Sequence, residues 1–282
     1  MSWFDRITGR GYRMDRVDQS ASPLQLDPSF SPYRFTNPSV RIAAIGDLHG
    51  RLDLLNLLQP DLDRAATDPD RRLIEVYLGD YIDRGPSSRQ VIDYMIRRKS
   101  LKDRDAVFLR GNHEQMLLVA LEDDQKFRQW VRYGGDATMM SYGVSPAGIG
   151  PQCSELRKAF RAAIPPSHLE FFKNLQNIYS EGGFVFVHAG VRPGIPLDQQ
   201  NEDDMLWIRE PFLNSIARFG ATVVHGHTPT TKLSLRPNRI GVDTGAYQTG
   251  ILTCLFVTSD GVTSVDTQRH AVTGGFAAAP RI

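Results

Sequence analysis

Three short polar clusters, each directly after an apolar run, constrain this chain more than any other feature of its sequence. The clusters are GDLHG at 46–50, GDYIDRG at 79–85 and GNHE at 111–114. The apolar runs before them lie at 41–45, 73–78 and 106–109. Such short, partly β-branched runs are typical of buried parallel strands, and side chains that follow successive parallel strands meet at one sheet edge. We therefore expect Asp47, His49, Asp80 and Asn112 to converge, as the ligands of a metal centre do.

Amphipathic segments separate the strand-like runs. Residues 51–58 follow the first cluster and residues 87–99 follow the second, where apolar side chains recur at helical spacing. Ser87 or Ser88 could cap the start of this second helix. The basic residues at 97–99 would lie at its solvated C-terminal end, where the helix dipole is negative. The repeated order of strand, helix and strand predicts an α/β protein with right-handed crossovers in a mostly parallel sheet.

Composition excludes several classes of protein. A chain of 282 residues, 41% hydrophobic and 23% charged, can bury a substantial core. The net charge of +1 gives no reason to expect nucleic acid as a partner. Cys153 and Cys254 have no metal-type spacing, which favours a reducing compartment. A charged N-terminus without an apolar run predicts no signal peptide and no membrane association, so we expect a cytoplasmic protein.

The rest of the chain divides into recognisable parts. Residues 1–40, rich in proline, predict an irregular arm, and residues 41–282 a catalytic domain with a helical insertion at about 115–180. Strand-like runs return at 183–187, 222–224, 239–242 and 251–257. A second polar group follows them, with His188 in VHAG and His225 and His227 in VHGHTP. His225 is expected to be a strand-end residue, and His168, outside any motif, a surface residue.

The polar groups favour metal-assisted phosphate chemistry. Aspartate, imidazole and amide ligands without thiolate suit Mn, Fe, Zn or a similar divalent ion. A carboxylate that bridges two such ions would let them share a hydroxide, a nucleophile that suits attack on a phosphoester. Glycine stands beside nearly every candidate ligand, which lets the backbone turn tightly near a metal.

The motifs GDLHG, GDYIDRG, GNHE, VHAG and GHTP, in this order, closely resemble the phosphoprotein phosphatase family of calcineurin-like metallophosphoesterases. The resemblance implies a four-layer α/β/β/α sandwich and a dinuclear metal site, with manganese favoured over iron or zinc. It implies a first metal held by Asp47, His49 and Asp80. Asp80 would bridge to a second metal, whose other ligands would be Asn112, His188 and His227.

The same resemblance assigns the residues around the metals. His113 would protonate the leaving group, Asp83 would orient His113, and Arg84 would bind phosphate. Arg209, in LWIRE at 206–210, matches a second phosphate-binding arginine. Guanidinium groups suit this task because they form planar, bidentate hydrogen bonds and stay ionised. Pro229 replaces a histidine that many other phosphoesterases of this fold have, which favours the phosphatase subclass.

The substrate is less constrained than the reaction. The insertion and the tail resemble bacterial serine/threonine phosphatases and the related diadenosine tetraphosphatases. We expect in-line attack on phosphoserine, phosphothreonine or phosphotyrosine in a protein. A dinucleoside polyphosphate is the alternative if the insertion forms a pocket in which Trp130, Tyr133 or Tyr142 stacks on adenine. An inactive phosphate-binding module is the third reading. The sequence does not define the oligomeric state.

Overall fold

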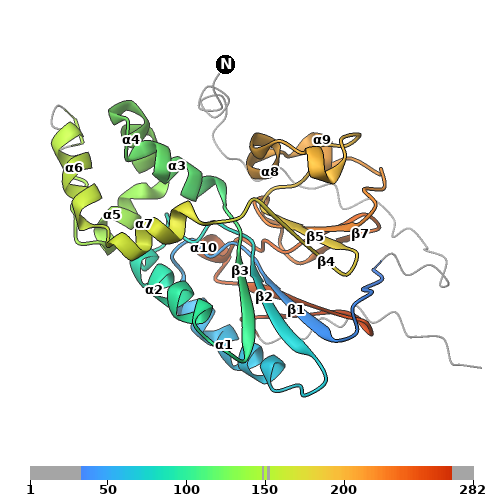
Figure 1. Cartoon of the computed structure of the whole chain (residues 1–282). Coiled ribbons are helices and arrows are strands. Elements are labelled where there is room, and N and C mark those ends of the chain that lie inside the picture. The colour runs from blue at the N-terminus through green and yellow to red at the C-terminus, as the bar shows by residue number, and fades with distance from the viewer. Residues whose placement is uncertain (1–32, 148, 151–152, 269–282) are drawn as a thin grey trace, which may run out of the picture. The chain divides into compact units, whose positions relative to one another are not determined.

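Two five-stranded sheets organise the computed structural model, which describes residues 33–147, 149–150 and 153–268 (Figure 1). The first sheet has the strand order β10-β9-β1-β2-β3 and contains β1 (Val40–Ile45), β2 (Arg72–Tyr77), β3 (Arg104–Phe108), β9 (Thr253–Thr258) and β10 (Gly261–Asp266). The second has the order β4-β5-β6-β8-β7 and contains β4 (Ile178–Glu181), β5 (Phe184–Val187), β6 (Thr222–His225), β7 (Ser234–Arg236) and β8 (Arg239–Gly241).

The main hydrophobic core lies between the two sheets. Ile42 and Val76 of the first sheet belong to the same buried cluster as Phe186 and Val224 of the second. Helices α1 (Leu52–Ala66) and α2 (Ser88–Lys99) cover the outer face of the first sheet (Figure 1). Helices α8 (Glu202–Trp207) and α9 (Glu210–Leu213) lie on the other side of the second, where Met205 and Phe212 pack against Val223. These layers confirm the predicted four-layer α/β/β/α sandwich.

Strand direction is more mixed than the sequence predicts. The crossover units do give parallel pairs, β1 with β2 and β2 with β3, and likewise β5 with β6 and β6 with β8. Each sheet also has two antiparallel pairs, because β9 runs against β1 and β10 against β9, while β4 and β7 flank the second sheet. The expectation of a mostly parallel sheet is therefore wrong: hairpin strands extend each parallel centre.

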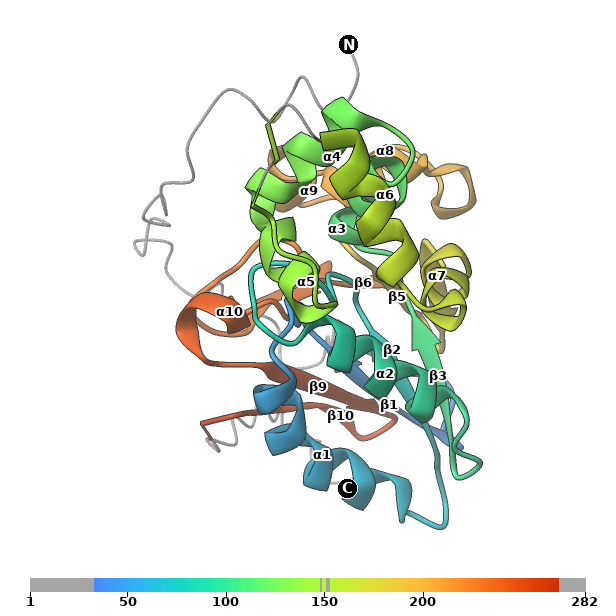
Figure 2. The ribbon, with the colours of Figure 1, turned by 90° about the vertical axis from the view of Figure 1, so that its left-hand side faces the viewer.

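The helices between β3 and β4 form a separate group near one end of the first sheet (Figure 2). They are α3 (Asn112–Ala120), α4 (Asp124–Trp130), α5 (Asp136–Ser141), α6 (Cys153–Ala163) and α7 (Pro166–Lys173). A π-helical turn at Val131–Gly135 joins α4 to α5, and the chain kinks there at Gly134, whose φ is 106°. Trp130 stacks on Phe160 in their shared core, with ring centroids 5.2 Å apart. We call these helices the helical insertion.

The described part of the N-terminal arm packs against the second sheet. Tyr33 donates a hydrogen bond to the carbonyl of Arg236 at 2.7 Å, and the Phe35 ring meets Phe184 edge-on. Residues 1–32 of the predicted arm lie outside the described residues.

A short helix, α10 (Ala246–Thr249), precedes β9. Among the described helices, none combines the length and the apolar character that crossing a bilayer requires.

Two polar side chains that we expected at the surface are buried. His168 of α7 is 2% exposed, and its ring nitrogens pair with the Tyr142 hydroxyl at 2.8 Å and with Asp93 at 3.0 Å. Arg98, in the predicted solvated helix end, is 5% exposed because it turns inward to Glu75 of β2. Amphipathic spacing alone does not reveal either residue, since its partners come from other elements.

Candidate active site

The six candidate metal ligands converge where the loops of the two sheets meet. Four follow strands of the first sheet, and two follow strands of the second. None is more than 7% exposed: Asp47, His49, Asp80, Asn112, His188 and His227. The expected convergence of the three polar clusters therefore occurs, and the second sheet completes the group.

Asp80 lies between two histidines from different sheets. Its Oδ2 atom is 3.5 Å from Nε2 of His49, and its Oδ1 atom is 3.5 Å from Nε2 of His188. Ligand atoms of Asp80, His188 and His227 all lie within 4.8 Å of one another, and so do those of Asp80, His49 and His113. A carboxylate with one oxygen toward each group is placed to bridge two cations.

The histidine hydrogen bonds fit a bound cation. Nδ1 of His188 donates to the carbonyl of Leu78 and Nδ1 of His49 to the carbonyl of Ile82, both at 2.9 Å. In a neutral imidazole the other nitrogen then presents a lone pair. Nε2 of His188 nevertheless lies 2.9 Å from the amide oxygen of Asn112, which is also an acceptor. A cation that took both atoms as adjacent ligands would satisfy them, and a backbone carbonyl behind the ring is common for metal-binding histidines.

Burial makes these histidines suitable ligands. It lowers the pKa of His49, His188 and His227, so their rings are neutral at neutral pH. The His227 ring turns Nδ1 toward the Asn112 amide oxygen at 2.9 Å, and its Nε2 atom is buried without a hydrogen-bond partner. Neutral imidazole is the form that binds metals.

Carboxyl groups concentrate negative charge beside the histidines. Burial raises the pKa of Asp47, and the neighbouring carboxylates of Asp243 and Asp80 raise it further. Burial also raises the pKa of Asp243 to about 6. Both oxygens of Asp47 accept the backbone N–H of His227, at 3.2 and 3.0 Å, which ties the first sheet to the second. Several buried carboxylates without a compensating ion would be costly, so this charge also fits a cation site.

His113 and Asp83 form a buried pair beside the metal ligands. Nδ1 of His113 lies 2.6 Å from Oδ2 of Asp83, and because a carboxylate only accepts, this nitrogen carries the proton. The backbone N–H of His113 also donates to Asp80 at 3.1 Å. The ring thus faces the ligand group with its position fixed from behind, as the predicted role for His113 requires.

Two arginines lie near different members of the ligand group, Arg84 beside His49 and Arg209 near His188 and His227. Arg84 is exposed, and its NH1 atom approaches Nε2 of His49 at 3.0 Å. Its guanidinium lies 4.8 Å from the ring centre of Tyr247, a residue to which the sequence assigns no role. Arg209 caps the N-terminus of α9 and is half-buried. Its charge is, after burial, the largest cause of the lowered pKa of His227. Both positive charges therefore lie close enough to the ligand group to favour an anion there.

Glu114 is a site residue that the sequence analysis overlooked, although it stands in the GNHE cluster. It is fully buried, and its carboxylate accepts four backbone N–H groups, from Gly111 and from three successive residues, Asp80, Tyr81 and Ile82. Burial raises its pKa to about 8, with the Asp80 and Asp83 charges adding to the effect. Glu114 therefore holds the loop that carries Asp80 and Asp83. Its place in the GNHE motif could have marked it as a site residue, but most of the backbone groups that it binds come from another loop and are revealed only by the fold.

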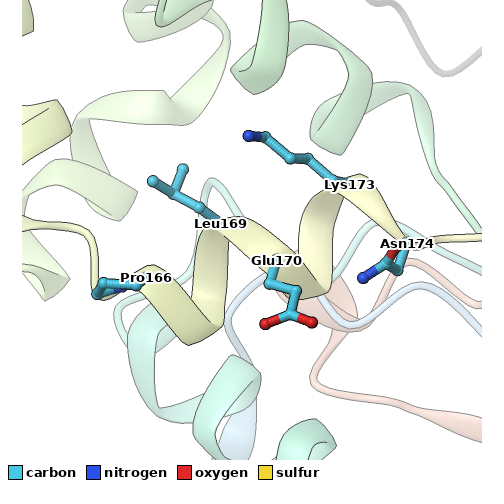
Figure 3. Close-up of a pocket in the computed structure, with 5 residues that line it drawn as sticks. All are labelled: Pro166, Leu169, Glu170, Lys173 and Asn174. Carbon is cyan, nitrogen blue, oxygen red and sulfur yellow. The ribbon is translucent and has the colours of Figure 1, made fainter.

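A hollow elsewhere on the surface is unrelated to this site. Its lining comes from α7 and the residue after it: Pro166, Leu169, Glu170, Lys173 and Asn174 (Figure 3). None of these is a candidate ligand or catalytic residue. The chemistry belongs to the polar cluster at the sheet edge.

Comparison with known proteins identifies the family. Residues 40–252 match the calcineurin-like phosphoesterase family. The chain is 26% identical over 233 residues to the asymmetrical bis(5'-nucleosyl)-tetraphosphatase PrpE of Anoxybacillus flavithermus, which covers 75% of this chain and 88% of that protein. It is 29% identical over 107 residues to human serine/threonine-protein phosphatase with EF-hands 1, covering 38% of this chain and 16% of that protein.

A solved structure supports the fold. The cold-active protein-tyrosine phosphatase of a psychrophilic Shewanella superposes with a TM-score of 0.55 at 17% identity, covering 85% of this chain and 83% of that one. The family match extends over most of the chain and includes every candidate ligand. The chain therefore belongs to the calcineurin-like phosphoesterase family and is a metal-dependent phosphoric ester hydrolase.

Proposed function

We propose that this protein hydrolyses dinucleoside tetraphosphates at a two-metal site built from the six candidate ligands. The observation that carries the reaction type is the position of Asp80 between His49 and His188, each of which turns a lone pair toward it. Asp47, His49 and Asp80 would hold one ion, and Asp80, Asn112, His188 and His227 the other. Manganese is our proposal for both, because a mixed set of oxygen and imidazole donors without thiolate suits it.

The bound ions would activate water and neutralise phosphate charge, and the chain supplies the rest. Arg84 and Arg209 would bind the nonbridging oxygens and so hold the phosphate within reach of His113. Planar guanidinium groups do this through paired, charge-assisted hydrogen bonds. His113 gives its proton to the departing oxygen, and Asp83 holds its ring in the orientation for transfer.

The choice of substrate is supported by the extent of similarity. The PrpE tetraphosphatase aligns along most of both chains, whereas the human protein phosphatase aligns with only a short segment. The aromatic residues that we considered for stacking on adenine differ in exposure. Trp130 and Tyr142 are buried, and their polar atoms are hydrogen-bonded to Asp83 and His168. Tyr133 is half-buried and directly precedes Gly134, which contacts Arg84, so it is our candidate for nucleobase contact.

A phosphoprotein is the second candidate substrate. It is favoured by the motif set of the phosphoprotein phosphatases and by the high exposure of Arg84, which an extended peptide could reach. That subclass, and the predicted activity on phosphoserine, phosphothreonine or phosphotyrosine, stays a prediction.

One assay distinguishes the candidates. Manganese-loaded protein is incubated in parallel with diadenosine tetraphosphate and with phosphoserine, phosphothreonine and phosphotyrosine peptides, and product formation is followed for each. We expect the highest kcat/KM for the dinucleotide. Faster turnover of a peptide would transfer the assignment to the protein phosphatases. A His113→Asn variant serves as the control for contaminating activity and should lose about 10²-fold or more in kcat.

A further inference from the structure

The helical insertion donates two hydrogen bonds to the carboxylate behind His113. Nε1 of Trp130 donates to Oδ2 of Asp83 at 2.8 Å, and the Thr138 hydroxyl donates to Oδ1 at 2.6 Å. Thr138 also accepts the backbone N–H of Asp83 at 2.9 Å. Asp83 lies in the loop after β2, so these bonds join residues about 50 positions apart in the chain.

The donors are rigid. Trp130 and Thr138 are both fully buried, and the Trp130 ring stacks on Phe160 with an interplanar angle of 24°. A Cβ atom at Gly135 would lie 2.4 Å from the same ring, so the backbone of the insertion packs directly against it. Asp83 itself has no exposed surface and a left-handed φ of 73°. Its carboxylate is therefore oriented by the insertion.

Each oxygen of Asp83 has a defined partner because of these bonds. Thr138 occupies Oδ1, while Oδ2 faces His113 and Trp130 together. Without the two donors the carboxylate could rotate or turn its charge away from Nδ1 of His113, and the ring would lose its fixed direction. Catalytic groups depend on such outer partners, because small displacements from the reactive geometry are costly.

We propose that Trp130 and Thr138 are positioning residues that hold Asp83 and thereby aim His113 at the leaving group. The inference rests on the proposed role of His113 as proton donor. It gives the helical insertion a part in the reaction, besides any part in binding substrate. The two residues touch neither substrate nor metal in this scheme.

Leaving-group dependence tests the proposal. Trp130→Phe removes the N–H donor and keeps a ring against Phe160, and Thr138→Val removes the hydroxyl with little change of shape. The substrates are phenyl phosphate, whose leaving group needs a proton, and p-nitrophenyl phosphate, whose leaving group does not. We expect kcat for phenyl phosphate to fall about 10-fold and kcat for p-nitrophenyl phosphate by less than about 3-fold. The 10-fold loss is smaller than the usual contribution of a general acid, because His113 is still present.

Tyr142→Phe is the matched control. Tyr142 is buried in the same insertion and meets Phe160 edge-on, but its hydroxyl pairs with His168 and not with Asp83. We expect both substrates to be turned over at the wild-type rate. In a His113→Asn background, Trp130→Phe should cause no further change in the ratio of the two rates. An equal fall for both substrates, or an unchanged ratio in both variants, would overturn the proposal.

A spectroscopic measurement separates this proposal from the proposed function. The Nδ1–H proton of His113 is observed by NMR in metal-free protein, where turnover plays no part. We expect its resonance to shift or broaden in Trp130→Phe and Thr138→Val and to stay unchanged in Tyr142→Phe. If wild type hydrolyses neither diadenosine tetraphosphate nor an aryl phosphate, the proposed function fails, and the resonance alone decides whether the insertion positions His113. An unperturbed resonance in both variants overturns the inference.

Discussion

Five residues of the candidate site have left-handed backbone conformations, which side chains other than glycine rarely adopt. They are the non-glycine residues with positive φ in the described parts of the chain: His49, Asp80, Asp83, Arg84 and His227. Each such backbone conformation costs on the order of 1–3 kcal/mol and persists only where the surrounding structure imposes it. Here the surroundings do so through Glu114, which accepts the N–H groups of the loop that carries Asp80. The strain turns side chains from separate strands toward one point.

Gly134 tests how closely the insertion controls Arg84. Its carbonyl accepts the N–H of Arg84 at 2.9 Å, and an added Cβ would lie 2.7 Å from Cγ of Arg84. Gly134→Ala should therefore displace Arg84 and lower kcat/KM for phosphate esters by about 10-fold or more. Gly143→Ala is the control, because Gly143 also has a positive φ but no atom within 4 Å of its added Cβ.

Both glycine variants should lose about 1 kcal/mol or more of stability from the same backbone strain. Activity and thermal unfolding are measured for each. Equal kcat/KM in the two variants would contradict the proposed contact with Arg84.

His225 should make stability depend on pH. It is 3% exposed, and burial lowers its pKa from 6.5 to about 4. A histidine whose pKa is lowered in the folded state binds fewer protons there than in the unfolded chain. Its contribution to stability is therefore complete above the unfolded-state pKa of 6.5 and is lost as the pH falls toward the folded-state pKa of about 4. Between pH 7 and 4, metal-free wild type should lose about 3 kcal/mol more than metal-free His225→Asn. Urea unfolding at each pH measures this, and parallel pH profiles would exclude the effect.

The sequence reveals some of these residues and not others for a physical reason. The candidate ligands stand in short motifs after apolar runs, where local pattern alone indicates a strand end. Trp130 is predicted only as a candidate for stacking on adenine, and the sequence assigns no role to Thr138 or Tyr247. Their roles come from contacts with loops far away in the chain, which no local pattern contains.

At the scale of elements, the central strands follow the predicted runs within one or two residues, and the edge strands β4, β7 and β10 were not predicted. The runs buried on both faces carry a strong apolar signal. By contrast, β4 and β7 are short, and β10, although six residues long, is partly exposed, so their sequences resemble loops. Helix α1 continues past Pro60 to Ala66, although the prediction ended it at Leu58. Its buried residues Leu62 and Ala65 extend the packing beyond the proline, and that packing outweighs the lost hydrogen bond.

A buried ionic cluster joins three of these elements. Glu75 of β2 has no exposed surface, and its carboxylate pairs with Arg98 of α2 and Arg104 of β3. Glu75→Gln keeps the shape but leaves two buried guanidinium groups short of charge, so we expect the unfolding free energy to fall by about 3 kcal/mol or more. Asp105→Asn is the control, because its pair with Arg72 is half exposed and solvent screens it, so we expect a much smaller loss.

Urea unfolding of the two variants provides the measurement, with p-nitrophenyl phosphate turnover as a check on the site. A loss for Glu75→Gln no greater than that for Asp105→Asn would mean that the cluster adds little beyond packing. Because the ionic cluster of Glu75, Arg98 and Arg104 is buried between α2, β2 and β3, we expect the larger loss of stability in Glu75→Gln.

At the scale of the described fold, the candidate metal site lies between the two sheets. Asp47, Asp80 and Asn112 come from loops of the first, and His188 and His227 from loops of the second. Besides the apolar core, the described contacts across this edge include Asn112 with both histidines and Asp47 with the backbone of His227. An ion held by ligands from both sheets should therefore stabilise the assembled sandwich and not the unfolded chain.

Metal addition tests this linkage without any assay of turnover. At 100 times its dissociation constant, Mn²⁺ should stabilise the fold by about 2.7 kcal/mol, which raises the unfolding temperature by about 5–10 °C. His188→Asn removes a ligand of the second sheet and should abolish most of that shift. His168→Asn is the matched control: it removes a buried, hydrogen-bonded histidine from the insertion, so it lowers the starting stability and keeps the full response to metal. A full shift in His188→Asn would place the ion on the first sheet alone, and the sandwich would then owe its cohesion at this edge to hydrogen bonds and apolar packing.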